Sequence, residues 1–363
     1  MTLDSKTPAE MTRRSFLGVA GATVASLAAP LSGGSFASTS TSGSAGNLIV
    51  LPQDGRGFYF DIIDGAQSEI CIEICVLEDP QILEHIQAAL QRGVSVRVIV
   101  DSAKYNELGS EREHLQKYLT SAGGELHLSN PIFPRSFPKI ILIDSSLLVY
   151  GSACLDQTTF LQYRDFATSS DDPQVLTDLE RLFENDWTYS APPGQQPPAF
   201  NPTSPFSSSD LVLCPVNGAE QLVRFYQGAQ QTLDVYTELL GNLTLESEMV
   251  AAVQRGVTVR LISPVHVNGG SKAIQNLQLA SLTALSSYSV DVHVNGQQTV
   301  PLPYLRARAA IADGQRAYIG SISLSPDGIT VNREMALIFR DSSLVQQLQA
   351  QFDSDYETIT RKF

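Results

Sequence analysis

The feature that most constrains the fold is an internal repeat, which covers most of the 363-residue chain. Early in each half, QRGVSVRVIV from Gln91 returns as QRGVTVRLIS from Gln254, 163 positions later. Late in each half, FENDW from Phe183 returns as FDSDY from Phe352, and here the separation is 169. Two constant separations that differ by six indicate one duplicated unit with a six-residue insertion in the second copy.

Within each copy, predicted strands and helices alternate. In the first copy, a strand at 70–76 is followed by a helix at 80–91 that ends before Gly93, and then by the β-branched strand VSVRVIVD. Alternation of this kind predicts an α/β fold whose mostly parallel sheet is flanked by helices on both faces. Two such repeats, fused in one chain, are expected to pack about a pseudo-twofold axis that brings equivalent loops together at their interface.

The composition along the chain sets the expected boundaries. Repeat 1 spans 47–190, a Pro- and Ser-rich linker spans 191–208, and repeat 2 spans 209–363. A disordered linker is expected at 38–46, after a targeting segment at 1–37.

The targeting segment contains TRRSFLG, then a small-residue apolar run, then SFA. It resembles a bacterial twin-arginine signal peptide, which implies export to the periplasm or the cell exterior. The apolar run is too short to span a bilayer, so no transmembrane segment is expected in the mature chain.

Charge and cysteine content exclude some kinds of site. The 24 basic and 38 acidic residues give a net charge of −14, so bulk binding of nucleic acid is not expected, and an anion site must be a local cluster of cations. Cys71 and Cys75 lie on one predicted strand, too far apart to bond to each other. A bridge between Cys154 and Cys214 stays open, although free buried thiols are favoured, and the spacing does not suggest a metal site.

A second pattern occurs once in each half with the same internal spacing. It consists of a cation, an aspartate five positions on and a Gly-Ser seven positions beyond that: Lys139, Asp144 and Gly151-Ser152, then Arg308, Asp313 and Gly320-Ser321. This frame resembles the phospholipase D superfamily, whose signature is His-x-Lys, four residues, Asp, six residues, Gly-Ser or Gly-Gly, one residue and Asn. The resemblance covers nearly all of the chain after the targeting segment.

The resemblance implies a two-step displacement at phosphorus that needs no cofactor and no metal. One histidine attacks to form a phosphohistidine, and the histidine of the other motif protonates the leaving alcohol. The two lysines neutralise the phosphoryl oxygens, and the asparagines add hydrogen bonds.

This chain departs from the signature at the residues that would do this chemistry. Phe137 and Arg306 stand at the two histidine positions, Arg308 replaces the second lysine, and Cys154 and Ser323 replace the asparagines. Phenylalanine has neither a lone pair nor a transferable proton, and arginine has no basic form near pH 7. The ordinary phosphohistidine reaction is therefore not expected.

The histidines that could substitute for the missing pair are His85, His114, His127, His266 and His293. His127 and His293 each lie on the strand before the motif, but solvated strand histidines are the favoured interpretation. Cys154 and Ser323 could act as nucleophiles, but no neighbouring base is visible, so packing or loop hydrogen bonding is favoured for them.

The cations that remain predict an anion site. Lys139, Arg306 and Arg308, helped by Ser152 and Ser321, are expected to converge at the interface of the repeats and to bind phosphate. The alternative is a structural ion network in which these arginines, with Arg164 and Arg333 on the next strands, pair with nearby carboxylates. The expected partners are Asp144, Asp165, Asp313 and Glu334.

Three functions therefore stay open. The leading hypothesis is an exported phospholipase D-like pseudoenzyme that binds a phosphate-bearing lipid headgroup, nucleotide or envelope polymer. The second is an active phosphodiesterase that uses substitute residues. The third is a structural or protein-interaction module.

Overall fold

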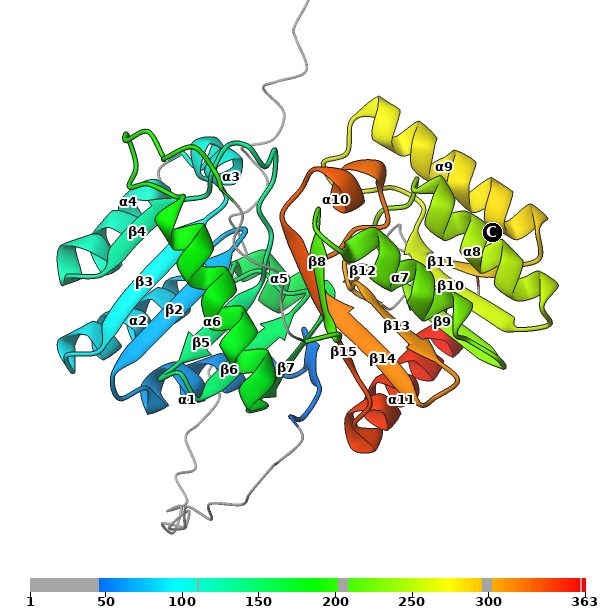
Figure 1. Ribbon diagram of the computed structural model, residues 1–363, viewed down its shortest axis with the longest axis horizontal. Helices are drawn as coiled ribbons and strands as arrows, with labels where there is room; N and C mark the ends of the chain where they lie inside the picture. The colour runs from blue at the N-terminus through cyan, green and yellow to red at the C-terminus, as the bar shows by residue number, and fades with distance from the viewer. Residues whose placement is uncertain (1–45, 110, 202–207, 296–301, 360) are drawn as a thin grey trace, which may run out of the picture. The chain divides into compact units, whose positions relative to one another are not determined.

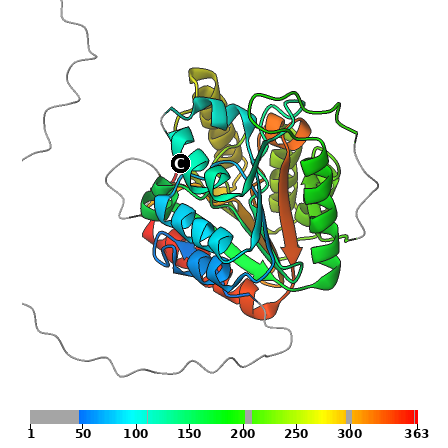
Figure 2. The same ribbon diagram turned by 90° about the vertical axis from the view of Figure 1, so that its left-hand side faces the viewer.

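The two halves of the chain form two α/β lobes that lie side by side in Figure 1, and Figure 2 views them from the side of the first lobe. The computed structural model describes residues 46–109, 111–201, 208–295, 302–359 and 361–363. Both lobes belong to one unit. The targeting segment expected at 1–37, and all but the last residue of the linker expected at 38–46, lie outside the described residues.

The first sheet contains seven strands of the first lobe in the order β1-β7-β6-β5-β2-β3-β4, and it gains a short strand, β12, from the second lobe. The bounds are β1 Ile49–Leu51, β2 Glu69–Ile74, β3 Ser95–Val100, β4 Glu125–Leu128, β5 Ile140–Ile143, β6 Leu147–Gly151, β7 Tyr163–Ser170 and β12 Tyr304–Leu305.

The second sheet repeats this plan in the order β11-β10-β9-β13-β14-β15-β8. Its bounds are β8 Leu211–Cys214, β9 Thr232–Tyr236, β10 Thr258–Pro264, β11 Asp291–Asn295, β13 Ala309–Ala312, β14 Arg316–Gly320 and β15 Glu334–Phe339. The duplication read from the sequence is therefore a duplication of the sheet, and the α/β fold with two fused repeats is confirmed.

Both sheets are mixed rather than mostly parallel. Within each lobe, parallel pairing joins strands connected through helices, such as β2 with β3 and β10 with β9 and β11, and the short β12 pairs parallel with β7 across the lobes. The strands that carry the motifs are antiparallel, because a tight turn joins β5 to β6 and another joins β13 to β14.

Helices cover both faces of each sheet. In the first lobe these are α1 Gly57–Gly65, α2 Pro80–Gln91, α3 Ser102–Glu107, α4 Glu111–Tyr118, α5 Gln157–Gln162 and α6 Pro173–Thr188. In the second they are α7 Gly218–Gln227, α8 Leu243–Gln254, α9 Lys272–Ser287, α10 Pro326–Thr330 and α11 Ser342–Thr358. The start of α2 shows how the sequence sets a helix boundary: the Asp79 carboxylate accepts the amides of Gln81 and Ile82, and Pro80 takes the first helical position.

Among the described residues, three apolar clusters form the core. One lies between the first sheet and the helices α1, α2 and α4, and a second lies between the second sheet and α7, α8 and α9. The third joins the lobes: Phe183 of α6 and Phe352 of α11, the aromatic residues of the repeated FENDW and FDSDY segments, are both buried in it. The two lobes therefore share one continuous hydrophobic interface.

The segments that enter the two motifs also cross between the lobes. The amide of Phe137 donates to the carbonyl oxygen of Arg333 at 2.7 Å, and the amide of Arg306 donates to the carbonyl oxygen of Arg164 at 3.0 Å. Each motif therefore begins on a backbone segment held by the other lobe, and this fixes both motifs at the interface.

Two buried ion pairs repeat the same crossing. Arg164 donates from Nε and Nη2 to Asp355 of α11 at 2.9 and 3.0 Å, and Arg333 donates to Asp186 of α6 at 2.8 Å from both Nε and Nη2. Each arginine thus pairs with the aspartate of the other repeat. The partners expected from the sequence were Asp165, Glu334 and the motif aspartates. For Arg164 and Arg333 the actual partners come from the terminal helices, which the crossing of the lobes brings to these strands, whereas the expected Asp165 does pair with Arg306.

The motif aspartates, Asp144 and Asp313, brace turns instead. Asp144 lies in the left-handed region at φ 51° and accepts the backbone amides of Gln67, Ser68 and Glu69 at 2.7 to 2.9 Å. Partial burial raises the pKa of its carboxyl group, but these hydrogen bonds outweigh burial and lower the pKa to about 2. Asp313 makes the equivalent bonds in the second lobe.

No helix in the described part of the chain combines the length and the apolar character needed to cross a membrane.

Candidate active-site cleft between the repeats

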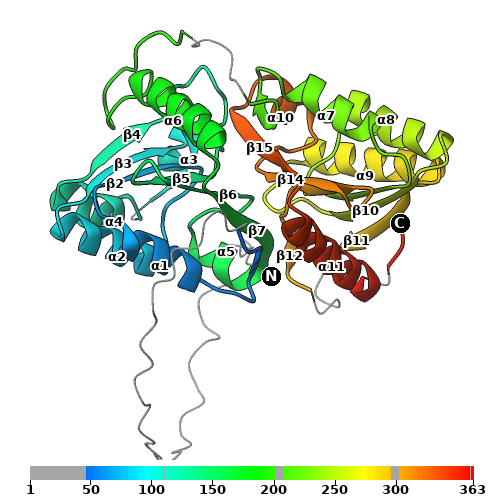
Figure 3. The ribbon, with the colours of Figure 1, turned by 60° about the horizontal axis from the view of Figure 1, so that its bottom comes forward.

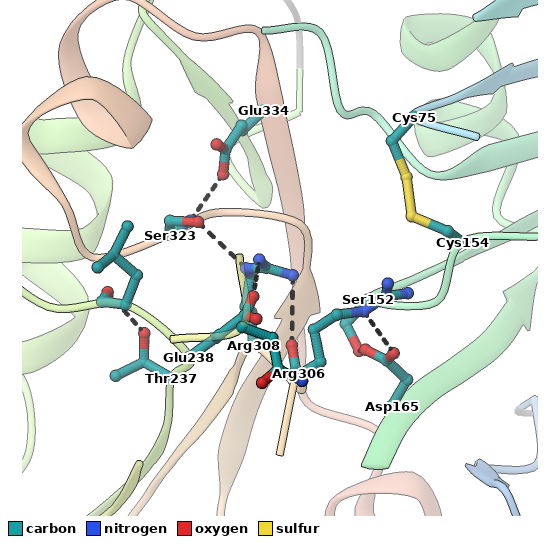
Figure 4. Close-up of polar contacts among 12 residues, drawn as sticks. Cys75, Ser152, Cys154, Asp165, Thr237, Glu238, Arg306, Arg308, Ser323 and Glu334 are labelled. Atoms are coloured by element: carbon teal, nitrogen blue, oxygen red, sulfur yellow. Dashed lines mark hydrogen bonds and ion pairs between the residues drawn. A yellow bond between two sulfur atoms is a disulfide. The ribbon is translucent and has the colours of Figure 1, made fainter. Parts of the chain in front are cut away.

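Two adjoining hollows of about 460 and 550 Å³ lie where the motif segments of the two lobes meet. Phe137, Glu238 and Arg308 line both of them, so they form one cleft. Lys139 and Arg306 line the smaller hollow. Figure 4 shows polar contacts around Arg308 in this region. The three cations predicted from the sequence therefore converge on one cavity.

Lys139, on the approach to β5, is the most deeply placed of these cations. Its side chain is buried, and its Nζ lies 2.5 Å from the carbonyl oxygen of Ser152. Burial, followed by the positive charges of Arg308 and Arg306, lowers the pKa of Lys139 well below its ordinary value of 10.5. A negative charge that enters the cleft would favour the protonated form of this amine.

Arg306 occupies the second histidine position and is held by the first repeat. Its Nε donates to Asp165 at 2.9 Å, its Nη2 donates to Thr159 at 2.7 Å, and its guanidinium lies over the ring of Tyr163. Its Nη1 has a 3.8 Å contact with Asp156. This looser contact leaves the Nη1 edge as the part of the guanidinium best able to turn to a ligand.

Arg308 is held within its own repeat by two loops. Its Nη2 donates to Glu238, which follows β9, at 2.5 Å, and its Nε donates to Ser323, which follows β14, at 3.2 Å. Glu238 also accepts the hydroxyl of Tyr304 at 3.0 Å. Glu238 was not among the residues singled out from the sequence.

Glu334 lies at the wall of the same cleft, at the start of β15. Its Oε2 accepts the amide of Ser323 at 2.6 Å, and its Oε1 accepts the side-chain amide of Asn332 at 3.3 Å. Burial raises the pKa of Glu334 from 4.5 to about 7, although Arg308 and the amide hydrogen bond work against the rise. Glu334 is therefore a carboxyl group that changes its charge near neutral pH.

A disulfide joins Cys75 to Cys154 at the wall of the cleft in the first repeat (Figure 4). The expectation that Cys75 and Cys154 are free thiols is therefore wrong. Cys75 follows β2 and Cys154 follows β6, and the folding of the sheet brings these two loops to the same edge. Cys71 and Cys214 are free and buried, so the bridge left open between Cys154 and Cys214 does not form.

The disulfide and the Arg308 cluster are equivalent by the internal repeat. Cys75 corresponds to Glu238, 163 positions later, and Cys154 corresponds to Ser323, 169 positions later. The same two loops are thus tied by a covalent bond in the first repeat and through the Arg308 guanidinium in the second.

Ser152 and Ser321, which were expected to help bind phosphate, face the protein. Both are fully buried: the Ser152 hydroxyl donates to Asp165 at 2.6 Å, and the Ser321 hydroxyl donates to the carbonyl oxygen of Met335 at 3.3 Å. In this conformation neither hydroxyl points to the cleft.

The two strand histidines also lie elsewhere. His127 stacks on Trp187 of α6 and bonds to the hydroxyl of Ser190, and His293 stacks on Tyr356 of α11. Neither lines the two hollows. The described residues also contain no group of histidine, cysteine and acidic side chains that could hold a metal ion.

A family model described as "Cardiolipin synthase, PLD-like domain" matches residues 59–187 and 222–356, one match in each lobe. The chain belongs to the phospholipase D superfamily. A cardiolipin synthase B of Salmonella typhi is 26% identical over 342 residues, which cover 84% of this chain and 79% of that protein. A cardiolipin synthase A of Pseudomonas syringae is 23% identical over 342 residues, 85% of this chain and 68% of that protein.

Among solved structures, a phosphatidylserine synthase of Haemophilus influenzae Rd KW20 superposes with a TM-score of 0.66. The superposition covers 88% of this chain and 87% of that chain, and the two are 13% identical. This match confirms the two-repeat fold.

The prediction of export to the periplasm or the cell exterior is contradicted by these relatives. They are named as synthases of the phospholipids cardiolipin and phosphatidylserine, not as exported proteins. The segment that suggested export resembles a signal in its short arginine, apolar and small-residue pattern, and this pattern lies outside the described residues.

Proposed function

We propose that this protein binds the phosphate group of a phospholipid headgroup in the cleft between its repeats, and that it does so without forming a phosphohistidine. The observation that carries the proposal is the convergence of Lys139, Arg306 and Arg308 on a cavity whose two histidine positions hold Phe137 and Arg306. The cations that neutralise a phosphoryl group are in place, and the nucleophile and the general acid of the family are missing.

An anion in this cleft would be held by individual cationic side chains and not by a net positive charge, because acidic side chains line the cleft as well. Arg306 and Arg308 are balanced by Asp165 and Glu238, and Lys139 has a depressed pKa. A phosphate near Lys139 stabilises its protonated form. The Nη1 edge of Arg306 supplies charge-assisted hydrogen bonds, which are stronger than neutral ones.

The relatives support a lipid over a nucleotide or an envelope polymer. The names of the cardiolipin synthases and of the phosphatidylserine synthase describe proteins that make phospholipids, whose headgroups carry phosphodiesters. The net charge of −14 also disfavours long polyanions, because the bulk field of the protein repels them.

A second candidate function is phosphodiester chemistry with substitute residues. Glu334, with a pKa of about 7, lines the cleft, and the buried amine of Lys139 lines its other part. Glu334 therefore titrates near neutral pH, as general acids and bases do. This candidate predicts catalytic turnover of a phosphodiester, whereas binding alone predicts none.

Calorimetric titration of the full-length protein with sn-glycerol 3-phosphate and with inorganic phosphate tests the proposal. We expect Arg306→Gln to weaken binding by about 10- to 100-fold, because a hydrogen bond to a charged group contributes about 1.5–3 kcal/mol. The matched control is Arg224→Gln, an exposed arginine on α7, which should bind as the wild type does.

Two results would contradict the proposal. One is the absence of binding of either probe to the wild type, and the other is equal affinity of the wild type and Arg306→Gln. Release of headgroup from phosphatidylglycerol vesicles that is lost in both Lys139→Met and Glu334→Gln would establish the second candidate function instead.

A further inference from the structure

The solvent-exposed side of α9 carries almost no charge. Its exposed residues include a single cation, Lys272 at the first turn, and no carboxylate; the others are Ala273, Asn276, Leu277, Leu279, Ala280, Thr283, Ala284 and Ser287. The whole chain has 38 acidic residues, so an acid-free helix of 16 residues on its surface is unusual in this protein. The helix at the same place in the first repeat, α4, has the sequence EREHLQKY.

Beside α9, helix α8 completes an apolar groove. Leu243 at the start of α8 is 75% exposed, and Tyr288 at the end of α9 is 61% exposed. Between them a groove of about 460 Å³ is lined on its apolar side by Val250 and Ala251 of α8 and by Ala284 and Leu285. Figures 1 and 3 show the two helices side by side on the second lobe. We call this surface, formed by Leu243, Val250, Ala251, Leu277, Ala280, Ala284 and Tyr288, the α8–α9 face.

Of the two carboxylates of α8, Glu246 lines the groove. The Glu246 side chain is buried, and its Oε1 accepts the amide of Gly241 at 2.6 Å. Glu248 accepts the side-chain amide of Gln227, which lies on α7. Both acidic groups of this helix are therefore engaged within the protein.

The α8–α9 face is continuous with the cleft. Leu277 belongs to the face, and it also lines the cleft together with Ile274, one turn earlier on α9, and with the loop residues Gly269 and Gly270. The apolar surface and the proposed phosphate site thus share one helix. A phospholipid matches this arrangement, because its phosphate suits the cleft and its apolar tails suit the α8–α9 face. A bilayer of such lipids matches the face for the same reason.

We propose that the α8–α9 face docks on a phospholipid bilayer and holds the mouth of the cleft against it. This inference rests on the proposed function, because it supplies the surface from which a lipid headgroup reaches the cleft. Attraction to anionic lipid does not drive the docking, since the residues of the face carry no charge and the chain as a whole is acidic. Burial of Leu243 and Tyr288 among the headgroups drives it, and aromatic side chains with a polar tip favour that depth.

Co-sedimentation of the full-length protein with extruded vesicles tests this inference. We expect binding to vesicles of pure phosphatidylcholine that changes less than twofold between 50 and 500 mM salt, values chosen to span about a threefold change in the screening length. Leu243→Asp and Tyr288→Asp should each lower the partition coefficient by about tenfold, because they place a carboxylate where apolar area was buried. Val216→Asp is the matched control, since Val216 is 57% exposed in the loop between β8 and α7.

Failure of this inference can be told apart from failure of the proposed function. Leu243→Asp should bind sn-glycerol 3-phosphate as the wild type does, because Leu243 does not line the cleft. Absence of vesicle binding by the wild type would overturn the bilayer inference and leave the cleft titration standing. An equal loss in Val216→Asp would also overturn it. So would a wild-type dimer that Leu243→Asp converts to a monomer in size-exclusion chromatography, since the face would then bind a second copy.

Discussion

Removing the Asp355 carboxylate should destabilise the whole protein, because this group holds the two repeats together. It accepts Arg164 through two hydrogen bonds of 2.9 and 3.0 Å, and it also accepts the hydroxyl of Tyr236 at 2.8 Å. Both members of the ion pair are 2% exposed. In Asp355→Ala the Arg164 guanidinium stays buried without its counter-charge, and its remaining acceptors are the Leu51 carbonyl oxygen and the Gln53 side chain.

The expected loss is about 3–5 kcal/mol of unfolding free energy, the range for breaking a buried pair by removal of one partner. With an unfolding entropy of about 2.1 cal/mol/K per residue, a loss of this size lowers Tm by about 6 °C in a unit of about 320 residues. The double variant Arg164→Met/Asp355→Leu should recover most of the loss, because apolar groups of similar volume replace a buried pair at little net cost.

Urea unfolding followed by circular dichroism, together with calorimetry, measures these effects. The control is Glu220→Ala, which breaks an exposed pair with Arg224 on α7 and should change stability by less than about 1 kcal/mol. A loss in Asp355→Ala no larger than in Glu220→Ala would refute the reasoning. So would a double variant that is less stable than Asp355→Ala, since the buried charge would then not be the source of the loss.

Two further predictions concern the cleft wall. The pKa of Glu334 is about 7 in the folded protein and about 4.5 in the unfolded chain. Protonated Glu334 therefore contributes its full share of the unfolding free energy below pH 4.5, and this share is lost as pH rises through 7. Glu334→Gln should therefore be more stable than wild type at pH 8 by up to about 3 kcal/mol and should equal it near pH 4. Denaturant unfolding at both pH values measures the difference, and a difference that does not depend on pH would contradict this account. The double variant Cys75→Ser/Cys154→Ser should lose about 4 kcal/mol, because the bridge closes a long loop in the unfolded chain, and urea unfolding with and without reductant checks this, with reductant expected to affect only the wild type.

The sequence was enough to predict the duplication, the α/β class and the position of the motifs at one interface. It was also enough to show that Phe137 and Arg306 replace the histidines, since the spacing to Asp144 and Asp313 is intact. These features depend on the spacing of residues along the chain, and the internal repeat reveals that spacing.

The partners of the buried charges could not be predicted in the same way. Arg164 and Arg333 pair with the aspartates of the terminal helices, and these contacts exist only because the lobes cross. Glu238 was missed because it has no counterpart of its own chemistry in the first repeat. The repeat separation aligns Glu238 with Cys75 and Ser323 with Cys154. A comparison of these two pairs of equivalent positions could have identified Glu238.

The crossed ion pairs have a consequence for how such a chain can arise. Arg164 is neutralised by the second repeat and Arg333 by the first, as happens when two identical subunits exchange partners across a twofold axis. A single ancestral repeat that dimerised would already have formed both pairs, so duplication needed only a linker and no new interface. Once the copies were fused, the two cleft walls could change separately, which fits a disulfide in one and an arginine bridge in the other.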